Sequence, residues 1–445
     1  RIKAYNDIGI EYAPINPTLS VDYINKALKL AIKTERPRGI AGAYNCLGIV
    51  DYYQKNYDSA IFYFQKALKI NEEVGHLWGQ AAALNQIGAV QNLKDDYNNA
   101  IESFQQASDI FKKMKDSLGL GKSIQNIGLV YSRMSYHKKA VEYYLEAIKI
   151  YEEIHNTAGV ARSYFSIGVI LNKQKEYYTA LEYLNLAFPK VKEIDDKSLL
   201  SAVLKNKGIS YRGLKDYSKA LNYFQEALEY KKGSNNNKTM ALIQSDIGTT
   251  YYDMELYDKA LEYQKVAVQN YELASENNEK ASMLNAIAKS FIEINQFEEA
   301  NFYVLKALKI AQNIKNLKEQ KTGYHTLAMI AQSEGESKKA LELYIKFQNY
   351  SDSLSVKEQR QQELELRTIY ETDKRDLQID NQKASIGILN LQNKNKTQLL
   401  IFGSLGLLIL FGAIMFYRSF LGVKKREIAQ QHFSQELIKT QEQER

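Results

Sequence analysis

The fold is decided by the stretch "LGIVDYYQKNYDSAIFYFQKAL", residues 47–68, because its pattern returns at one constant interval along most of the chain. In this stretch Gly48 is followed by Ala60 after twelve residues and by Ala67 after nineteen. The stretch "KGISYRGLKDYSKALNYFQEAL", residues 207–228, repeats that spacing. The leading small residue recurs in register at Gly48, Gly88, Gly128, Gly168, Gly208, Gly248, Ala288 and Ala328. A pattern that repeats without insertion predicts an array of identical structural units.

Each unit is predicted to form two helices joined by a short turn such as "QKNYDSA", residues 54–60. Two helices that cross closely need small residues at the contact, and the repeated glycine and alanines supply them. Aromatic residues stand three positions before the first alanine, and most of the 33 tyrosines are therefore assigned to packing. One hairpin cannot bury its apolar face alone, so stacking of neighbouring units must build the core.

This spacing of glycine and two alanines resembles the tetratricopeptide repeat (TPR). The usual repeat has about 34 residues. The 40-residue unit found here is similar to the long-helix subclass of bacterial signalling proteins, in which the additional residues extend the helices. The resemblance implies an all-α solenoid that binds a peptide or protein in its groove. We expect a degenerate first unit at residues 1–40 and eight units over residues 41–350.

Residues 351–398 are polar and Gln-rich and predict one long helix. Tyr370, Leu377, Ala384 and Leu391 recur every seven residues, the spacing of a coiled-coil seam. Polar residues at the partner positions, Lys374 and Asn381, argue against a stable coiled coil. We expect this juxtamembrane helix to pair with a second copy in a homodimer.

Residues 399–417, "LLIFGSLGLLILFGAIMFY", contain no charge and predict one transmembrane helix. A buried core helix is the alternative, and the highly polar flanks argue against it. Basic residues are more frequent after the segment than before it: Arg418, Lys424, Lys425 and Arg426 follow, whereas Lys394 and Lys396 precede. This asymmetry places the C-terminus in the cytoplasm and the repeats in the periplasm of a single-pass inner-membrane protein.

The C-terminal segment 418–445 ends in "QELIKTQEQER", residues 435–445. Its Gln441, Glu442, Glu444 and Arg445 resemble the beginning of the dimerisation helix in sensor histidine kinases of the NarL-like class. The resemblance implies a phosphoacceptor His–Asp pair beyond Arg445 and a response regulator as partner. It also implies ATP and Mg²⁺ as cofactors of a kinase domain outside these residues. We expect the sequence to be a piece of a longer chain at both ends, and a preceding signal sequence is neither indicated nor excluded.

No catalytic or metal site is predicted within these residues. His432 lacks the acidic neighbour of a phosphoacceptor, and Cys46 is the only cysteine. A net charge of +7 is modest for this length and is too small to argue for direct nucleic-acid binding unless the charge is clustered. The other histidines lie in different units without ligand spacing, at His76, His137, His155 and His325.

The inner surface of the predicted solenoid carries the candidate ligand site. In the resembled family this surface is lined by the first helix of each unit, and fifteen such positions in the third to fifth units include no acidic residue. Six of them are basic: Lys122, Arg133, Arg162, Lys173, Lys205 and Arg212. They predict an electropositive pocket for an acidic peptide, a free carboxylate or another anion. The alternative is an ordinary solvated surface.

Asparagines occupy one shared inner position in three units, at Asn45, Asn85 and Asn285. A side-chain amide both donates and accepts, so these residues are predicted to pair with a ligand backbone. Cys46 beside Asn45 is interpreted as a small packed residue rather than a reactive thiol.

Two functions remain open at this point. The first is the extracytoplasmic sensing region and membrane span of a two-component histidine kinase. The second is a membrane-tethered TPR scaffold, or a transcriptional regulator ending in a helix-turn-helix, without kinase activity. The sequence identifies neither the ligand nor the response regulator nor the genes it controls.

Overall fold

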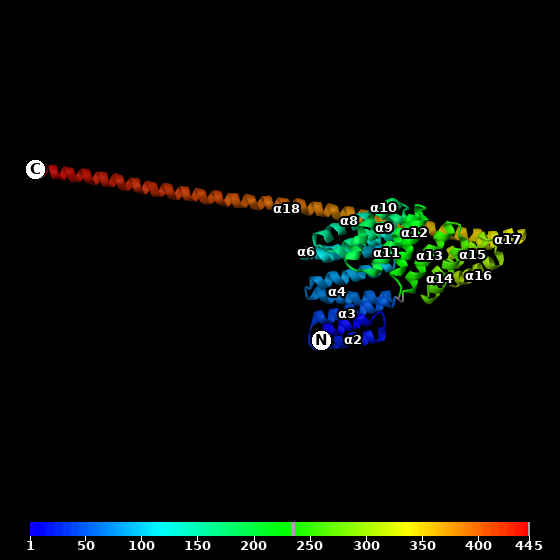
Figure 1. The fold of residues 1–445 in the computed structure, drawn as a ribbon. Helices are drawn as coiled ribbons and strands as arrows, with labels where there is room; N and C mark the ends of the chain where they lie inside the picture. The colour runs from blue at the N-terminus through cyan, green and yellow to red at the C-terminus, as the bar shows by residue number, and fades with distance from the viewer. Residues whose placement is uncertain (233–235, 444–445) are drawn as a thin grey trace. The chain divides into compact units, whose positions relative to one another are not determined.

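In a computed structural model the protein is helical throughout the described residues, 1–232 and 236–443, as the sequence pattern predicts. The chain divides into two units, Arg1–Ile369 and Tyr370–Arg445. The first contains the repeats, a stack of antiparallel helix pairs (Figure 1). Glu444 and Arg445, which belong to the kinase resemblance, lie outside the described residues.

The helices of the repeats come in alternating pairs. The first helices are α3 (Pro37–Tyr53), α5 (Leu77–Leu93), α7 (Ser117–Arg133), α9 (Thr157–Lys173), α11 (Lys197–Gly213), α13 (Asn237–Asp253), α15 (Asn277–Glu293) and α17 (Leu317–Ser333). The second helices are α4 (Tyr57–Glu73), α6 (Tyr97–Met114), α8 (His137–Glu153), α10 (Tyr177–Glu193), α12 (Tyr217–Glu229), α14 (Tyr257–Leu273), α16 (Phe297–Asn313) and the beginning of α18 (Ser337–Gln443). Most of these helices have 17 residues, so the longer unit extends both helices, as expected.

Nearly every connection between these helices is the same short turn, whether within a unit or between units. Its middle residue has a positive φ, as in Lys55 (63°), Gly75 (63°) and Asp95 (60°), and this feature recurs at equal intervals along the repeats. After α3, the N–H of Asn56 donates to the carbonyl of Asp51, and that of Lys55 to the carbonyl of Tyr52. This is the Schellman pattern, which satisfies the last carbonyls of a helix and reverses the chain.

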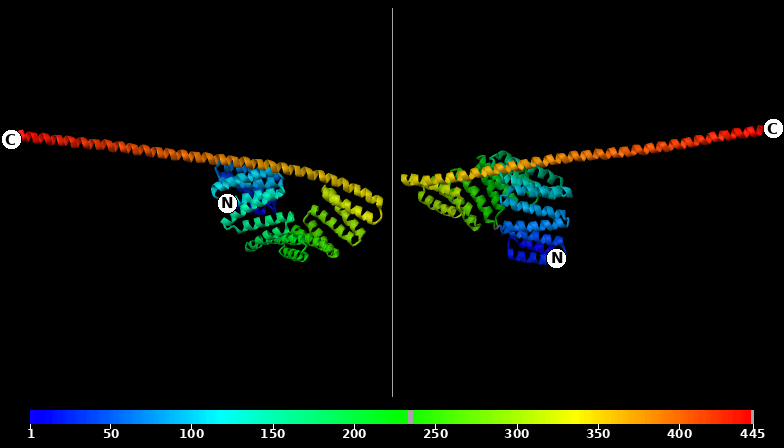
Figure 2. Two further views of the ribbon diagram at one scale, coloured as in Figure 1. Left: turned by 90° about the horizontal axis from the view of Figure 1, so that it is seen from above. Right: turned by 180° about the vertical axis from the view of Figure 1, so that it is seen from behind.

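The first helices form the inner layer of a curved stack, which Figure 2 shows from two further sides. Each helix packs against the next in the chain, and successive first helices also touch, from α1 to α13 and again between α15 and α17. No comparable contact joins successive second helices in the part of the chain described. The stack therefore curves with its first helices on the inside.

The repeated glycine lies where the two helices of a unit cross. A Cβ built on Gly48 would lie 2.6 Å from the ring of Phe64, and one on Gly208 would lie 2.6 Å from the ring of Phe224. Such distances are too short for any larger residue. The glycine is thus required by the ring that stands sixteen residues later, and both belong to the core.

The unit before the repeats departs from their geometry. Helix α1 (Ile2–Tyr12) has 11 residues, and four residues rather than three separate it from α2 (Pro17–Lys33). Gly9 packs on Ile24, an interval of fifteen instead of sixteen residues. The first helix is therefore both short and displaced by one position relative to the repeats that follow.

Helix α18 contains 107 residues and has no break at residue 350, where the repeats were expected to end. It begins as the second helix of the eighth unit and continues through the apolar segment 399–417. One stretch of it is long and apolar enough to cross a membrane, with a mean hydropathy of 2.6 and 0% of that stretch buried. Tyr370, Leu377 and Leu391 are exposed in the single chain.

The helix crossing is tested with Ala180, which is fully buried. Ala180→Trp should overpack the contact between α9 and α10 and lower the free energy of unfolding by about 1–3 kcal/mol. The measurement is urea unfolding of the chain in detergent micelles, followed by circular dichroism. Lys175→Ala on the exposed turn is the matched control and should change the free energy by less than about 0.5 kcal/mol. Equal losses in the two variants would contradict the packing described here.

The turn geometry gives a second stability prediction. Lys175 has a φ of 63°, a conformation that costs free energy in any residue with a Cβ. Lys175→Gly should therefore raise the free energy of unfolding by up to about 1 kcal/mol, although glycine ordinarily weakens helices. The same urea experiment measures it. A loss of stability in this variant would show that the turn is not left-handed.

Candidate functional site

The central groove is a cavity of about 430 Å³ on the inner faces of α7, α9 and α11. Five of the predicted inner positions line it together: Gln125, Leu129, Arg162, Phe165 and Ala202. Gln125 is held in place, because its Nε2 donates to Ser163 Oγ at 2.9 Å. The groove combines apolar residues with polar ones, and its lining includes both members of the ion pair Arg162–Asp196.

The three predicted arginines each meet a carboxylate of a neighbouring unit. Arg133 lies 2.9 Å from Asp95, and Arg162 lies 3.5 Å from Asp196. Arg212 lies 3.3 Å from Asp246. The fifteen inner positions contain no acidic residue, as the sequence shows, but each of the three arginines pairs with a carboxylate outside those positions. The three aspartates stand 34 or 38 residues away in sequence, outside the inner positions from which the electropositive pocket was predicted.

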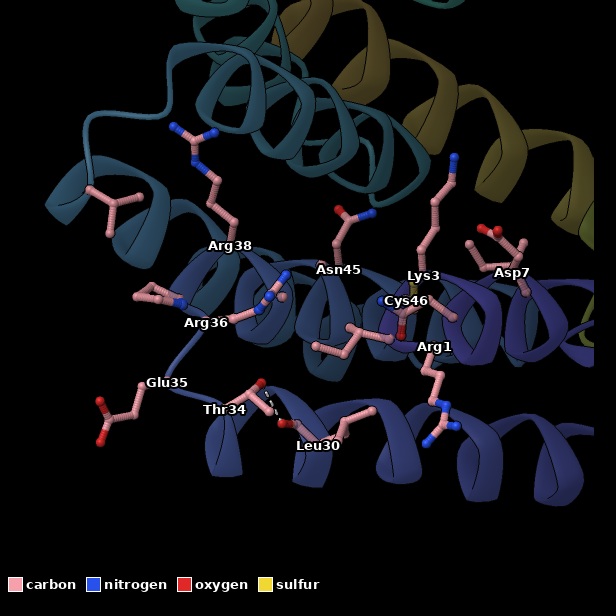
Figure 3. Close-up of a pocket in the computed structure, with 17 residues that line it drawn as sticks. Arg1, Lys3, Asp7, Leu30, Thr34, Glu35, Arg36, Arg38, Asn45 and Cys46 are labelled. Carbon is pink, nitrogen blue, oxygen red and sulfur yellow. Dashed lines mark hydrogen bonds between the residues drawn. The ribbon is translucent and has the colours of Figure 1, made fainter.

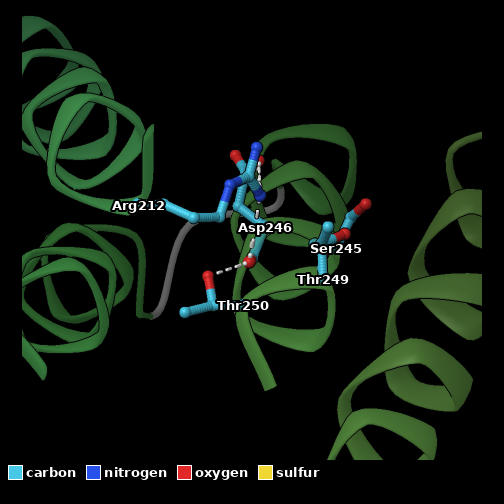
Figure 4. Close-up of polar contacts among 5 residues, drawn as sticks. All are labelled: Arg212, Ser245, Asp246, Thr249 and Thr250. Atoms are coloured by element: carbon cyan, nitrogen blue, oxygen red, sulfur yellow. Dashed lines mark hydrogen bonds and ion pairs between the residues drawn. The ribbon is translucent and has the colours of Figure 1, made fainter. Parts of the chain in front are cut away.

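The pair Arg212–Asp246 is the least exposed of the three (Figure 4). Arg212 Nη1 donates to Asp246 Oδ1 at 3.3 Å and to its backbone carbonyl at 3.4 Å, an oxygen that also accepts from Thr250 Oγ1 at 2.7 Å. Burial raises the pKa of Asp246, while Arg212 and Lys205 oppose the rise. Burial also raises the pKa of Asp253, and the nearby Arg212 again opposes the rise.

The three predicted lysines form no ion pair with the residues that the structure describes. Lys122 and Lys173 are exposed, and Lys205 is half-buried near Asp246. Burial lowers the pKa of His137, and the nearby Lys173 lowers it further. The six basic residues are thus not one cluster, since three are paired, Lys205 faces a carboxylate, and two face solvent.

The three predicted asparagines have different surroundings. Asn85 Nδ2 donates to Ser123 Oγ at 3.0 Å in the next unit. Asn285 is buried and donates to Glu319, at 2.8 Å to Oε2 and 3.2 Å to the carbonyl. Both therefore connect adjacent units. Asn45 alone makes no side-chain hydrogen bond to the described residues, and it lines a second cavity.

That second cavity, the N-terminal pocket, has a volume of about 1030 Å³ and lies between α1, α3 and the turn that joins α2 to α3 (Figure 3). Lys3, Asn6, Arg36, Arg38 and Asn45 line its polar side. Its apolar side includes Ile2, Ile10, Leu30, Pro37 and Val74. The sequence did not reveal it, because the one-position displacement of α1 hides the equivalence of Asn6 to Asn45.

Asn6 is 9% exposed, and its buried Oδ1 has no hydrogen-bond partner in the described chain. An unsatisfied buried acceptor costs about 1–3 kcal/mol. Oδ1 of Asn92 and Oδ1 of Asn285 are likewise buried without a partner among the described residues, so this feature is not confined to the pocket.

Cys46 forms part of the wall of this pocket and is buried. Burial raises the pKa of Cys46 to about 12, and the nearby Asp7 carboxylate adds to the rise. The thiol therefore stays protonated at neutral pH and lacks the thiolate needed for nucleophilic chemistry.

The ion pair of Asp246 predicts a pH-dependent stability defect. Arg212→Met leaves the carboxylate buried without its cation and should lower the free energy of unfolding by about 1–3 kcal/mol at pH 7. Because the folded-state pKa of Asp246 is already raised by burial, the loss of Arg212 raises that pKa further. The defect is present above the folded-state pKa and disappears below about pH 4, where the carboxyl is protonated in both states.

Urea unfolding at pH 7 and at pH 4 measures this defect. Lys215→Met, which removes an exposed lysine, is the matched control and should have no such pH dependence. Adding Asp246→Asn to Arg212→Met should restore most of the stability at pH 7. A defect of equal size at both pH values would contradict the assignment to Asp246.

Comparison with known proteins addresses the fold. A tetratricopeptide repeat family model matches residues 79–153, 159–232 and 239–313, and a second such model matches residues 41–74. A search of curated proteins found no match. The fold is similar to solved structures with low sequence identity, which supports likeness of fold alone.

One such structure is a signal transduction ATPase with numerous domains and a TPR sensor, from Pyrococcus horikoshii. It has a TM-score of 0.56 and 18% identity, and the match covers 76% of this chain and 54% of that protein, so this chain spans about half its length. The apo quorum sensor NprR from B. thuringiensis has a TM-score of 0.52 and 18% identity, covering 68% of this chain and 87% of NprR. A Rap protein complexed with Competence and Sporulation Factor has a TM-score of 0.51 and 13% identity, covering 80% and 98%.

The repeat models match more than half of the chain, and the 17-residue helix pairs stack as that repeat requires. Repeats of this kind mediate binding between proteins. The chain therefore belongs to the tetratricopeptide repeat family.

Proposed function

We propose that this chain is the sensing region and membrane span of a receptor whose repeats bind a peptide or protein outside the cytoplasm. The observation that carries the proposal is the continuity of α18. One helix includes both the last helix of the repeats and the apolar segment, so no loop separates the two.

The membrane span is supported by the properties of the apolar segment. At 1.5 Å per residue, nineteen residues reach about 28 Å, close to the hydrocarbon thickness of about 30 Å. Its large apolar side chains, among them Leu407, Leu410 and Phe411, are more than half exposed. Nothing in the described chain covers them, and a lipid environment would. The basic residues that follow favour a cytoplasmic C-terminus.

A peptide or protein ligand is supported by the family and by the structural neighbours. The Rap structure contains Competence and Sporulation Factor, and NprR is described as a quorum sensor. The Pyrococcus protein is described as carrying its TPR region as a sensor. Both cavities of this chain lie among first helices, on the side that such a ligand would reach.

The output module is proposed from the C-terminal sequence. Gln441, Glu442, Glu444 and Arg445 resemble the beginning of a histidine-kinase dimerisation helix. A second copy paired along α18 and a response regulator as downstream partner follow from this resemblance. Reading the coding sequence beyond Arg445 tests it. A His–Asp pair within about a dozen residues, then an ATP-binding domain, supports the kinase, whereas a helix-turn-helix in their place would overturn it.

Topology is tested with reporter fusions in the full-length gene. Alkaline phosphatase, active only outside the cytoplasm, should be active when fused after Lys357 and inactive when fused after Gln430. A green fluorescent protein fusion should give the opposite pattern. The apolar segment lies between the two fusion sites and should place them on opposite sides of the membrane. Deletion of residues 399–417 should therefore abolish the difference in reporter activity between the two sites. If both sites report the cytoplasm in the intact protein, the receptor proposal fails.

A further inference from the structure

We propose that the first part of α18, residues 337–369, is a strap that closes the repeat stack into a ring, and that release of its contact at Ile369 lets the stack change its curvature. These residues belong to the same unit of the chain as the repeats. The inference rests on the proposed function only for the purpose of this release, which is to report that the repeats have bound a partner.

The strap is attached to the eighth unit by aromatic contacts. The ring of Tyr350 stacks on that of Tyr324 in α17, with centroids 5.3 Å apart, and the ring of Phe347 lies 4.8 Å from that of His325. Such ring pairs stabilise a contact beyond the burial of their area. This end of α18 therefore moves with the eighth unit.

The second attachment of the strap is Ile369, which packs against the apolar core formed by α6 to α10. Ile369 is half-buried, whereas Leu366, one turn earlier, is 67% exposed. Between the two attachments the described side chains of residues 355–367 are exposed. Figure 2 (left) shows the stack curving away from α18 at the eighth unit and returning to it at the earlier units. The strap and the stack between its attachments thus form a closed ring.

The rigidity of a helix makes this ring a constraint on curvature. From Tyr350 to Ile369 the helix is about 28 Å long, and it cannot stretch without breaking its backbone hydrogen bonds. In a stack of repeats, small changes at each interface add up along the array. Since the strap cannot follow the summed displacement, a change of curvature requires one of its two attachments to open.

The contact at Ile369 is the attachment that opens. An apolar contact loses about a quarter to a half of its attraction when the gap between the atoms widens by about 0.5–1 Å. One half-buried isoleucine also contributes only part of the free energy of a fully buried one, so it favours the closed ring by a factor on the order of ten. A partner that binds the open shape more tightly by a similar factor would reverse this preference.

The strap is tested by pulsed electron paramagnetic resonance on the full chain in detergent micelles. Spin labels are attached at two exposed positions, Ser135→Cys on the turn after α7 and Glu363→Cys on the strap, in a chain that carries Cys46→Ser. Excess unlabelled chain confines the measurement to distances within one molecule. The parent should give one narrow distribution of distances. Ile369→Asp places a charge in the apolar contact and should move at least about half of the molecules to longer distances.

Two further variants separate the contact from a general effect on the helix. Leu366→Asp introduces the same charge one turn earlier, at an exposed position, and should leave the distribution unchanged. Ile369→Ala removes the contact without adding a charge and should shift the distribution in the same direction by a smaller amount. Unchanged distances in Ile369→Asp, or an equal shift in Ile369→Asp and Leu366→Asp, would overturn the proposal.

The curvature of the stack is measured with labels at Ser135→Cys and Asn295→Cys, on exposed turns of the third and seventh units. Ile369→Asp should shift or broaden this distance as well, and Leu366→Asp should not. If Ile369→Asp releases the strap while the distance between the two turns stays the same, α18 does not constrain the stack and the proposal fails. Neither measurement uses a ligand or a membrane, so a negative result here leaves the receptor proposal standing, and failed reporter fusions leave the strap standing.

Discussion

The three-residue turn with a left-handed middle residue is the constraint on which the rest of the structure depends. It joins helices within units and between units, and it returns at one interval from Glu35 to Lys215 and again from Glu255 to Gly335. Because these turns are alike and the sequence period is constant, equivalent residues of successive units meet at fixed sequence intervals. Hydrogen bonds between units therefore recur at separations of 38 residues, as in Asn85–Ser123 and Gln125–Ser163, and of 34 residues, as in Asn285–Glu319. A single inserted residue would break this register, and none occurs across the eight units.

The fold was predictable because its determinants lie close together in sequence. Gly48 and Phe64 belong to one hairpin, so the small residue and the larger residue that packs on it recur together, with a ring in units such as Gly88–Phe104 and Gly208–Phe224 and with Leu184 opposite Gly168. The site was less predictable because its electrostatics depend on pairs from different units. The electropositive pocket was inferred from the first helices of the third to fifth units. Asp95, however, lies in a turn, and Asp246 lies on α13 of the sixth unit. A search for acidic residues 34 or 38 positions away from each arginine would have found both carboxylates.

The N-terminal pocket was hidden for a different physical reason. α1 ends three residues after Gly9, whereas α3 ends five residues after Gly48, and the turn after α1 is only one residue longer. Gly9 is therefore one position closer to its partner Ile24, and a search at the period of the repeats aligns Asn6 with Cys46 instead of Asn45.

The last helix of the repeats is also in contact with earlier units. α18 begins in the eighth unit, and its Ile369 also packs against the apolar core formed by α6 to α10, so it contacts the stack at two places along its length. In such a stack the coupling between distant sites is the sum of small changes at each interface. A ligand changes the shape of the stack only if it binds one shape with higher affinity than another. A hydrogen bond or ion pair such as Arg212–Asp246 is lost after a displacement that apolar packing would tolerate. Interfaces that contain such contacts therefore allow only a few relative positions of the neighbouring units. The paired arginines are therefore better placed to set the curvature of the stack than to bind the ligand.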